Sequence, residues 1–288
     1  MLASFHRKVF NDDIMDTLLG SEFDSTPLRK ASGVSISSED HIDRNEDSYL
    51  IDQRHDVYGV FDGVGGHEGG QFASQTAMEV ARRRSAEETG FGTLEDADIF
   101  LRFVLVEANA TILRQNPEAA TTAVLVKITD VDGIEYASIA HTGDSRAYIW
   151  REGVLTTLTT DHTPFRAPGH TQEAREQQDR LARVVDPSEL SQESMKMFAQ
   201  RNIIGACLGH DSTVKADIKH IAVQEGDVLI MTSDGVHDNL TPADMESILN
   251  ATAGTNYAGA LTYASYQRAR EQGFRSKKDD ITAVVVLI

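Results

Sequence analysis

Four short acidic motifs, spread over the whole chain, constrain its fold more than any other sequence feature. Each places a carboxylate at one end of an apolar, strand-like run; they are Asn45-Glu46-Asp47-Ser48, Phe61-Asp62-Gly63-Val64-Gly65-Gly66, Thr232-Ser233-Asp234-Gly235 and Lys278-Asp279-Asp280-Ile281-Thr282. Ionised carboxylates held together beside a core repel one another and need a counter-charge. Mg²⁺ and Mn²⁺ suit such a place, because hard cations take oxygen ligands. The pattern therefore predicts a fold that gathers distant strand ends around metal ions.

The bulk composition narrows the class of protein. The chain has 288 residues, 40% apolar and 25% charged, which is typical of a globular protein with a substantial core. Its net charge of −18 disfavours nucleic acid and anionic membrane surfaces as partners. We find no apolar run of the roughly 20 residues needed to span a bilayer and no signal-peptide core. With Cys207 as the single cysteine, these features predict a cytoplasmic location.

Hydrophobic periodicity predicts alternating blocks of strands and helices. Strands are expected near 33–37, 47–52, 56–61, 120–129, 135–141, 147–150, 218–223 and 227–232, with a last one after Asp280. Helices are expected near 71–84, 94–115, 242–250 and 257–271. In the second helix, the predicted apolar face consists of Ile99, Phe103, Val106, Ala110 and Leu113. This order favours an α+β fold, a four-layer α-β-β-α sandwich with two central, mainly antiparallel sheets.

Two segments differ from the rest of the chain. Residues 1–30 are polar and mixed, and we expect an N-terminal extension there, followed by one domain over 31–288. Residues 161–201 are charge-rich, contain Pro164, Pro168 and Pro187, and have one helical pattern near 173–184. A long polar insertion between strands is more often a functional flap than a second domain.

The glycine cluster from Asp62 to Gly70 lies where a strand ends and a helix begins. Glycines allow sharp turns and let a backbone carbonyl approach an ion closely. A phosphate-binding loop is the rival interpretation, but neither the GxGxxG spacing nor a following Lys-Ser/Thr is present. Gly143-Asp144 forms a similar turn at a strand edge, which by itself is common in ordinary hairpins.

Taken in order, these motifs resemble the metal-dependent PPM family of serine/threonine protein phosphatases, the type 2C class. The resemblance runs from about Gly33 to Ile288, and the Gly-Gly-His-x-Gly-Gly extension at residues 65–70 is similar to the bacterial branch. It implies a two-metal centre, with two Mn²⁺ or Mg²⁺ ions, in a cleft at one edge of the sandwich. It also implies that the polar segment beyond Leu158 is the flap on the substrate side.

The resemblance also implies a role for each matching residue. Asp62 would bridge both ions and the carbonyl of Gly63 would bind one of them, whereas Glu46, Asp234 and Asp279 would hold the second. Asp144 matches the position of a third, weaker metal. Asp47 would act from outside the ligand set as an orienting carboxylate, and Asp280, at a position that is often Asn in relatives, would have a supporting role. Members of the family usually carry an Arg near Ala206, so the stretch 202–209 is expected to be structural here.

One departure concerns the phosphate-binding arginine that relatives place four residues before the first Glu, where this chain has Ile42. On a strand, Arg44 would lie on the same face as Ile42, and its bidentate fork suits phosphate. Arg44 is therefore a candidate catalytic residue together with Asp62. The competing interpretation is an ion pair of Arg44 with Asp43 or Glu46. We expect His67, His162 and His237 to be solvated rather than catalytic.

The leading hypothesis is a phosphatase that acts on phosphoserine and phosphothreonine in proteins and opposes a protein kinase in signalling. Two cations about 3.5–4 Å apart activate a water for in-line attack, so no nucleophilic side chain is needed. Cys207 has no cationic neighbour in sequence and is expected to be a small buried hydrophobe. The alternative function is a catalytically silent relative that binds a phosphoprotein or a partner. The acidic motifs favour the enzyme, and the missing Arg at Ile42 favours the alternative.

Overall fold

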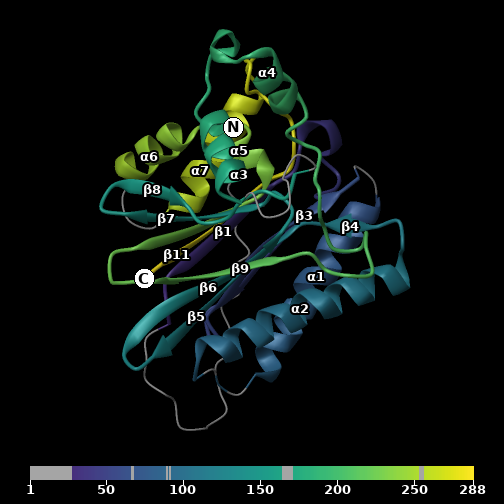
Figure 1. Ribbon diagram of the computed structural model, residues 1–288, viewed down its shortest axis with the longest axis vertical. Helices are drawn as coiled ribbons and strands as arrows, with labels where there is room; N and C mark the ends of the chain where they lie inside the picture. Colours follow the sequence, from purple (N-terminus) through teal and green to yellow (C-terminus); the bar gives the residue numbers. More distant parts are fainter. Residues whose placement is uncertain (1–27, 66–67, 89, 91, 164–170, 253–255) are drawn as a thin grey trace, which may run out of the picture.

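The computed structural model describes residues 28–288 except 66–67, 89, 91, 164–170 and 253–255 (Figure 1). Most of the expected N-terminal extension, residues 1–27, lies outside the described residues, as does His67. None of the helices described here combines the length and apolarity that crossing a membrane requires.

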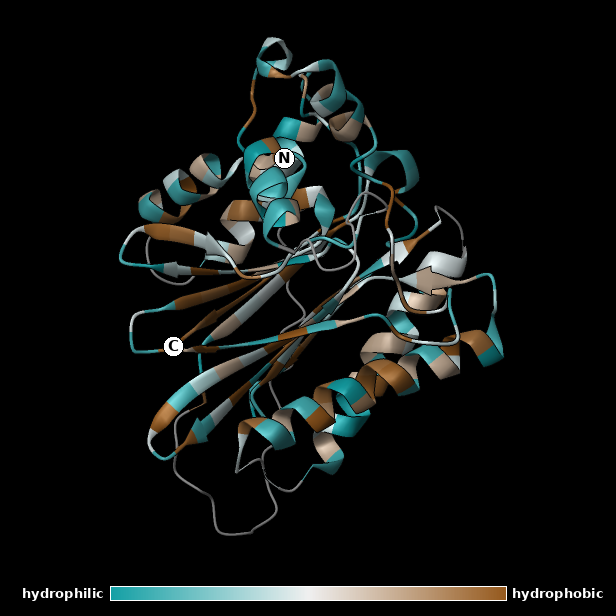
Figure 2. Cartoon of the chain, in the orientation of Figure 1, coloured by the Kyte–Doolittle hydropathy of each residue, from teal (hydrophilic) through white to brown (hydrophobic). Residues whose placement is uncertain are grey.

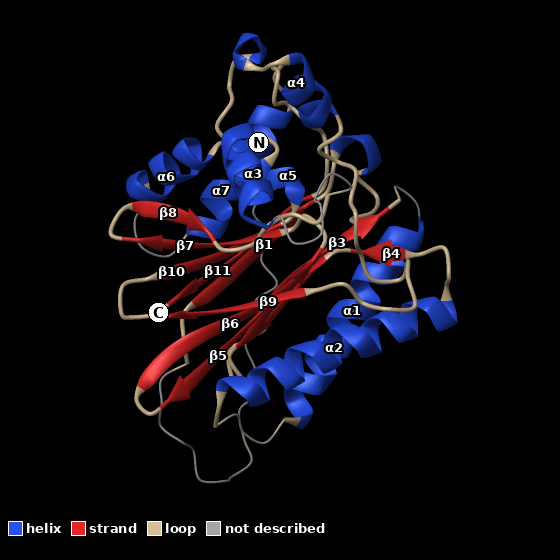
Figure 3. Ribbon diagram, viewed as in Figure 1, coloured by secondary structure: helices blue, strands red, loops and turns tan. Residues whose placement is uncertain are grey.

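Two antiparallel sheets form the centre of the fold (Figure 3). The first has the strand order β1-β11-β10-β7-β8, with β1 Ala31–Ile36, β7 Arg146–Arg151, β8 Val154–Thr157, β10 Val228–Thr232 and β11 Ile281–Leu287. The second has the order β2-β3-β5-β6-β9, with β2 Asp47–Asp52, β3 Val57–Val64, β5 Ala123–Val131, β6 Ile134–Thr142 and β9 Asp217–Ala222. The short strand β4, Ala120–Thr121, pairs with the end of β3.

Helices cover the outer face of each sheet. The second sheet carries α1, Glu68–Glu87, and α2, Leu94–Gln115 (Figure 1). The first sheet carries α5, Asp234–His237, α6, Pro242–Ala251, and α7, Tyr257–Ala269. The 161–201 segment adds α3, Thr171–Ala182, and α4, Gln192–Ala199, above one end of the sandwich. Short 3-10 helices occupy Glu39–His41 and Pro187–Glu189.

Three apolar layers hold these four layers of structure together. In β11, Val284 and Val286 pack between the sheets, whereas Ala283 and Val285 pack under α6 and α7. The same alternation in β10 places Met231 between the sheets. Such a period of two is what a strand with both faces buried requires. Figure 2 shows the apolar colour concentrated on these central strands. The predicted four-layer α-β-β-α sandwich is confirmed.

The predicted apolar face of α2 is wrong, although its predicted bounds are correct. Ile99, Phe103 and Val106 are 61%, 49% and 55% exposed. The face that meets α1 and the second sheet consists instead of Ala97, Phe100, Leu101, Val104, Leu105, Ala108 and Ile112. Both sets of residues recur at helical intervals, so periodicity alone does not separate them.

Candidate metal centre

The two sheets bring the first acidic motifs together at one end of the sandwich. Asp47 and Asp62 are direct partners across the antiparallel β2–β3 ladder. The backbone N–H of Asp234, at the start of α5, donates to Asp62 Oδ2 at 3.4 Å. Asp234 follows β10 of the other sheet, so this contact joins the ends of both sheets.

All six predicted metal ligands line one pocket of about 280 Å³. They are Glu46, Asp62, Gly63, Asp144, Asp234 and Asp279. Thr122, Asn202, Ile204 and Lys277 also contribute to its wall. The pocket therefore joins predicted ligands that are up to 233 positions apart in the sequence, counting from Glu46 to Asp279.

Two glycines allow the backbone to close around one side of this pocket. A Cβ on Gly70 would lie 3.1 Å from both Glu46 Oε2 and the carbonyl oxygen of Gly63. These two oxygens therefore flank the same small space. A Cβ on Gly63 would lie only 2.4 Å from the Gly70 carbonyl oxygen, so a side chain at position 63 is excluded. The structure pairs the Gly63 carbonyl with Glu46, whereas the family resemblance groups Glu46 with Asp234 and Asp279.

Burial and the neighbouring negative charges disfavour the ionised forms of the carboxyl groups in this pocket. Burial, then repulsion from Asp47 and Asp234, raises the pKa of Asp62 well above its usual range. Burial also raises the pKa of Asp234, against the opposing effect of Lys277. The pKa of Asp144 rises to about 7 through burial and repulsion from Asp161. An oxygen-rich, buried and anionic site of this kind fits divalent cations such as Mn²⁺ or Mg²⁺.

Asp47 and Asp280 surround this ligand set. Burial raises the pKa of Asp47 to about 8, while hydrogen bonds from Thr282 and Ser233 oppose the rise. Asp280 accepts the backbone N–H of Glu46 at 2.7 Å and that of Ser38 at 2.8 Å. Asp280 therefore fixes the backbone that carries Glu46.

Arg44 pairs with Glu46, at 2.9 Å from Arg44 Nε to Glu46 Oε1. The structure thus contains the ion pair that the competing interpretation expected. The strand-based argument about Ile42 was wrong, because residues 42–43 form a turn and β2 begins only at Asp47. Ile42 itself is 72% exposed.

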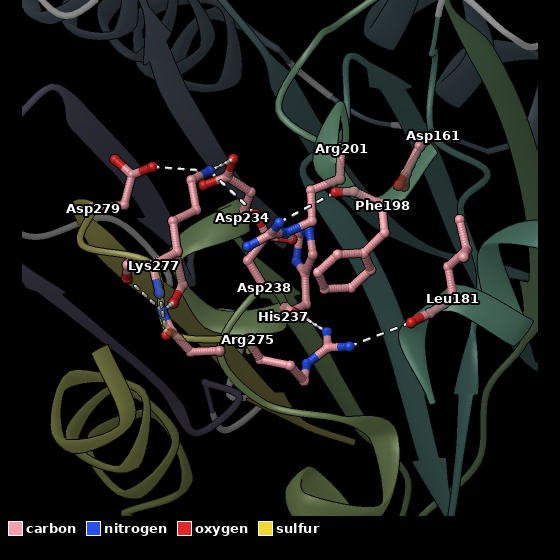
Figure 4. Close-up of polar contacts among 12 residues, drawn as sticks. Asp161, Leu181, Phe198, Arg201, Asp234, His237, Asp238, Arg275, Lys277 and Asp279 are labelled. Atoms are coloured by element: carbon pink, nitrogen blue, oxygen red, sulfur yellow. Dashed lines mark hydrogen bonds and ion pairs between the residues drawn. The ribbon is translucent and has the colours of Figure 1, made fainter. Parts of the chain in front are cut away.

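Lys277 is the site residue that sequence reasoning missed. Its ammonium contacts Asp234, and lies 3.2 Å from Asp238 Oδ2 and 3.0 Å from Asp279 Oδ2 (Figure 4). The sequence signal was a basic pair, Lys277-Lys278, directly before Asp279. Nothing local distinguishes the two lysines, although Lys278 instead pairs with exposed Asp40.

The 161–201 segment lies against the same end of the sandwich. A smaller cavity of about 80 Å³ separates α3 and α4 from α5, and Asp144 and Asp234 line it as well as the metal pocket. Arg275 closes one side: it donates to the carbonyls of Leu181 and Val184 and to that of His237 (Figure 4). Phe198 of α4 stacks on Phe274, with ring centroids 4.2 Å apart. Helix α4 was not predicted.

The expectation of solvated histidines was wrong for His162 and His237, which are 7% and 3% exposed. His237 contacts Thr232 Oγ1, and burial lowers its pKa well below the usual range. His162 accepts the N–H of Gly143, stacks on His141, and lies 3.4 Å from Asp217. His141, His162 and Asp217 form a further group of side chains that could hold a metal, separate from the carboxylate pocket.

Comparison with protein families places the chain among phosphatases. The model of protein phosphatase 2C matches residues 27–168, and that of stage II sporulation protein E matches residues 192–288. The serine/threonine phosphatase stp of Listeria monocytogenes is 27% identical over 197 residues, which cover 67% of this chain and 71% of that protein. The serine/threonine protein phosphatase PstP of Mycobacterium tuberculosis is 28% identical over 72% of this chain, but only 36% of PstP is covered.

Solved structures agree on the fold. The serine/threonine phosphatase Stp1 from Staphylococcus aureus has a TM-score of 0.71 at 22% identity, over 94% of this chain and 99% of that one. The PPM phosphatase MsPP from Mycobacterium smegmatis has a TM-score of 0.68 at 20% identity, over 91% of this chain and all of that one. The chain is thus similar to the PPM family, the family of protein phosphatase 2C, over residues 27–168, and it shares the fold of these solved phosphatases over 91–94% of its length.

Proposed function

We propose that the protein is a metal-dependent phosphatase that hydrolyses phosphoserine and phosphothreonine esters in proteins. The observation that carries this proposal is the convergence of all six predicted metal ligands on one pocket. The names of the relatives of this chain, serine/threonine phosphatase stp and serine/threonine protein phosphatase PstP, support this activity. An opposing protein kinase is the partner that such an activity requires.

The residues of the pocket have distinct roles in this proposal. Asp62, near the end of β3, pairs with Asp47 and accepts the backbone N–H of Asp234, and it would hold both cations. Glu46 and the Gly63 carbonyl form one side, and Asp234 with Asp279 forms the other. Two Mn²⁺ or Mg²⁺ ions bound there supply Lewis acidity, which lowers the pKa of a water and offsets phosphoryl charge. Asp144 lines both this pocket and the cavity beside α3 and α4, and would hold a third ion.

The 161–201 segment is the expected flap on the substrate side. Its helices lie beside Asp144 and Asp234, and Arg275 ties the end of α3 to α5. A phosphate monoester carries about two negative charges at neutral pH. A protein with a net charge of −18 must therefore offset that charge locally, which bound cations achieve.

The test is hydrolysis of p-nitrophenyl phosphate and of a phosphothreonine peptide, with and without Mn²⁺. We expect Mn²⁺-stimulated turnover by the wild type and its loss in Asp62→Asn, because Asp62 is central to the pocket. Asp211→Asn is the matched control, since Asp211 is exposed and does not line the pocket. A wild type that binds Mn²⁺ but gives no stimulated turnover contradicts the proposal.

A second candidate function is phosphoprotein or partner binding without turnover. Two observations favour it: Arg44 is paired with Glu46, and the exposed Ile42 carries no charge. In this structure, therefore, neither Arg44 nor Ile42 offers a free cation to phosphate. Retained binding of the phosphopeptide together with absent turnover in the same assays would select this function.

A further inference from the structure

Lys277 occupies a position that a metal ion would also need. Its ammonium contacts Asp234 and lies 3.0 Å from Asp279 Oδ2, and both residues are predicted metal ligands (Figure 4). Its side chain is only 18% exposed. The lone pairs of a carboxylate oxygen that accept a hydrogen bond from an ammonium group are the same lone pairs that coordinate a metal cation. Metal and Lys277 therefore compete for these oxygens.

The position of Lys277 is fixed by the fold. Asn239, which is fully buried, accepts the backbone N–H of Lys277 at 3.0 Å and donates to its carbonyl at 2.9 Å. This pair of hydrogen bonds holds the backbone between α7 and β11 against the end of α5. The clamp fixes the backbone from which the Lys277 side chain extends, and the ammonium reaches the pocket through its contacts with Asp234 and Asp279.

A third carboxylate offers Lys277 an alternative partner. Asp238 Oδ2 lies 3.2 Å from the ammonium, and Asp238 does not line the metal pocket. The Asp238 side chain is 9% exposed and also pairs with Arg201 of the 161–201 segment at 3.3 Å. The long lysine side chain can keep one ion pair with Asp238 while it leaves the other two carboxylates.

We propose that Lys277 is a built-in counter-cation of Asp234 and Asp279, which a metal displaces onto Asp238 when it binds. The inference rests on the metal centre of the proposed function. It has two consequences: the metal-free pocket is stabilised by Lys277, and metal affinity at the Asp234–Asp279 side is reduced. Lys277 is thus a positioning residue that sets the metal concentration at which the centre is filled.

The test is calorimetric titration of Mn²⁺ into the full chain, in the absence of substrate. We expect Lys277→Met to bind Mn²⁺ at least about tenfold more tightly than the wild type, because one unit charge is removed from a partly desolvated site. Lys278→Met is the matched control, because it removes the same charge from the adjacent residue in the sequence. The Lys278 side chain is 49% exposed and pairs with Asp40. We expect its affinity to stay within about twofold of wild type, because exposed charges are screened.

Thermal unfolding provides a second readout that does not depend on turnover. Metal-free Lys277→Met should melt below the wild type, and saturating Mn²⁺ should raise its Tm by more than it raises the wild-type Tm. Lys277→Gln serves if the methionine variant fails to fold. The inference is overturned if Lys277→Met and Lys277→Gln bind Mn²⁺ no more tightly than the wild type. It is also overturned if Lys278→Met gains as much Mn²⁺ affinity as Lys277→Met. Since neither measurement involves a phosphate ester, failure of this inference and failure of the phosphatase proposal are distinguishable.

Discussion

Asp280 accepts the backbone N–H of Glu46 at 2.7 Å, across 234 residues of sequence. Its other carboxylate oxygen accepts the N–H of Ser38 at 2.8 Å. The loop before β11 therefore sets the position of a predicted metal ligand from the opposite end of the sequence. This relationship depends on both oxygens of Asp280, which is 3% exposed.

Replacing Asp280 by Ala should weaken both stability and metal binding. The two buried N–H groups lose their acceptors, at about 1–3 kcal/mol for each unsatisfied group. Loss of a group that orients a ligand typically reduces metal affinity 10–100-fold. Urea unfolding and Mn²⁺ calorimetry measure the two effects. Asp280→Asn keeps one acceptor and should lie between Ala and wild type; Mn²⁺ affinity of Asp280→Ala equal to wild type would contradict the role.

The metal-free protein should lose stability as the pH rises from about 5 to 8. The pKa values of Asp47, about 8, and Asp144, about 7, lie above the value near 4 of an unfolded carboxyl. The native state then holds more protons than the unfolded state in this window, so its stability falls with pH. Titration of Asp144 alone corresponds to a loss of up to about 3 kcal/mol of stability over this window.

Urea unfolding at pH 5.5 and 8.0, with a chelator present, measures this slope. Asp144→Asn should flatten the slope, because the variant cannot titrate at that position. Mn²⁺ should bind more tightly at the higher pH, since binding displaces protons from the carboxyl groups. An identical slope in the wild type and Asp144→Asn would show that Asp144 has no raised pKa.

Gly63→Ala should damage the pocket through its backbone. The added Cβ would meet the Gly70 carbonyl oxygen at 2.4 Å and the Glu46 carbonyl oxygen at 2.6 Å, and backbone atoms cannot move aside cheaply. Overpacking of this kind typically costs about 1–3 kcal/mol. Gly92→Ala is the control, because a Cβ there meets nothing within 4 Å. The Tm and Mn²⁺ affinity of both variants test the prediction, and equal values for the two would refute it.

Arg275→Met should loosen the contact between the 161–201 segment and the body of the protein. Three hydrogen bonds, to Leu181, Val184 and His237, are lost together. Hydrogen exchange of the α3 amides should therefore quicken by roughly tenfold, as expected for a local loss of about 1–2 kcal/mol. Arg183→Met removes an exposed arginine from the same region and should leave exchange unchanged. Equal exchange in both variants would show that Arg275 does not hold the segment.

The sequence predicted the layers and the gathering of the acidic motifs because both follow from local patterns. A carboxylate directly after the apolar run of a strand, as at Asp62 and Asp234, lies near the sheet end wherever that strand pairs. The bounds of α2 followed from Pro117, which lies just beyond its end, and from periodic apolar residues. These signals need no knowledge of the tertiary structure.

The remaining features depend on contacts between distant residues. The buried face of α2 is decided by α1 and the second sheet, so Ile99 and Leu101 cannot be ranked by spacing alone. Arg44 lies after a turn rather than on a strand, and only coordinates show its contact with Glu46. Lys277 is distinguished from Lys278 by Asn239, which lies 38 positions away.

The place of β11 between β1 and β10 has a consequence for synthesis in the cell. During translation, β1, β7 and β10 all leave the ribosome before the strand that must lie between two of them. The first sheet cannot close, and Asp279 and Asp280 cannot reach Glu46, until residues 281–287 have emerged. Up to that moment the nascent chain exposes the unpaired edges of β1 and β10, which chaperones bind. A chain stalled before β11 therefore also lacks an assembled set of metal-binding carboxylates.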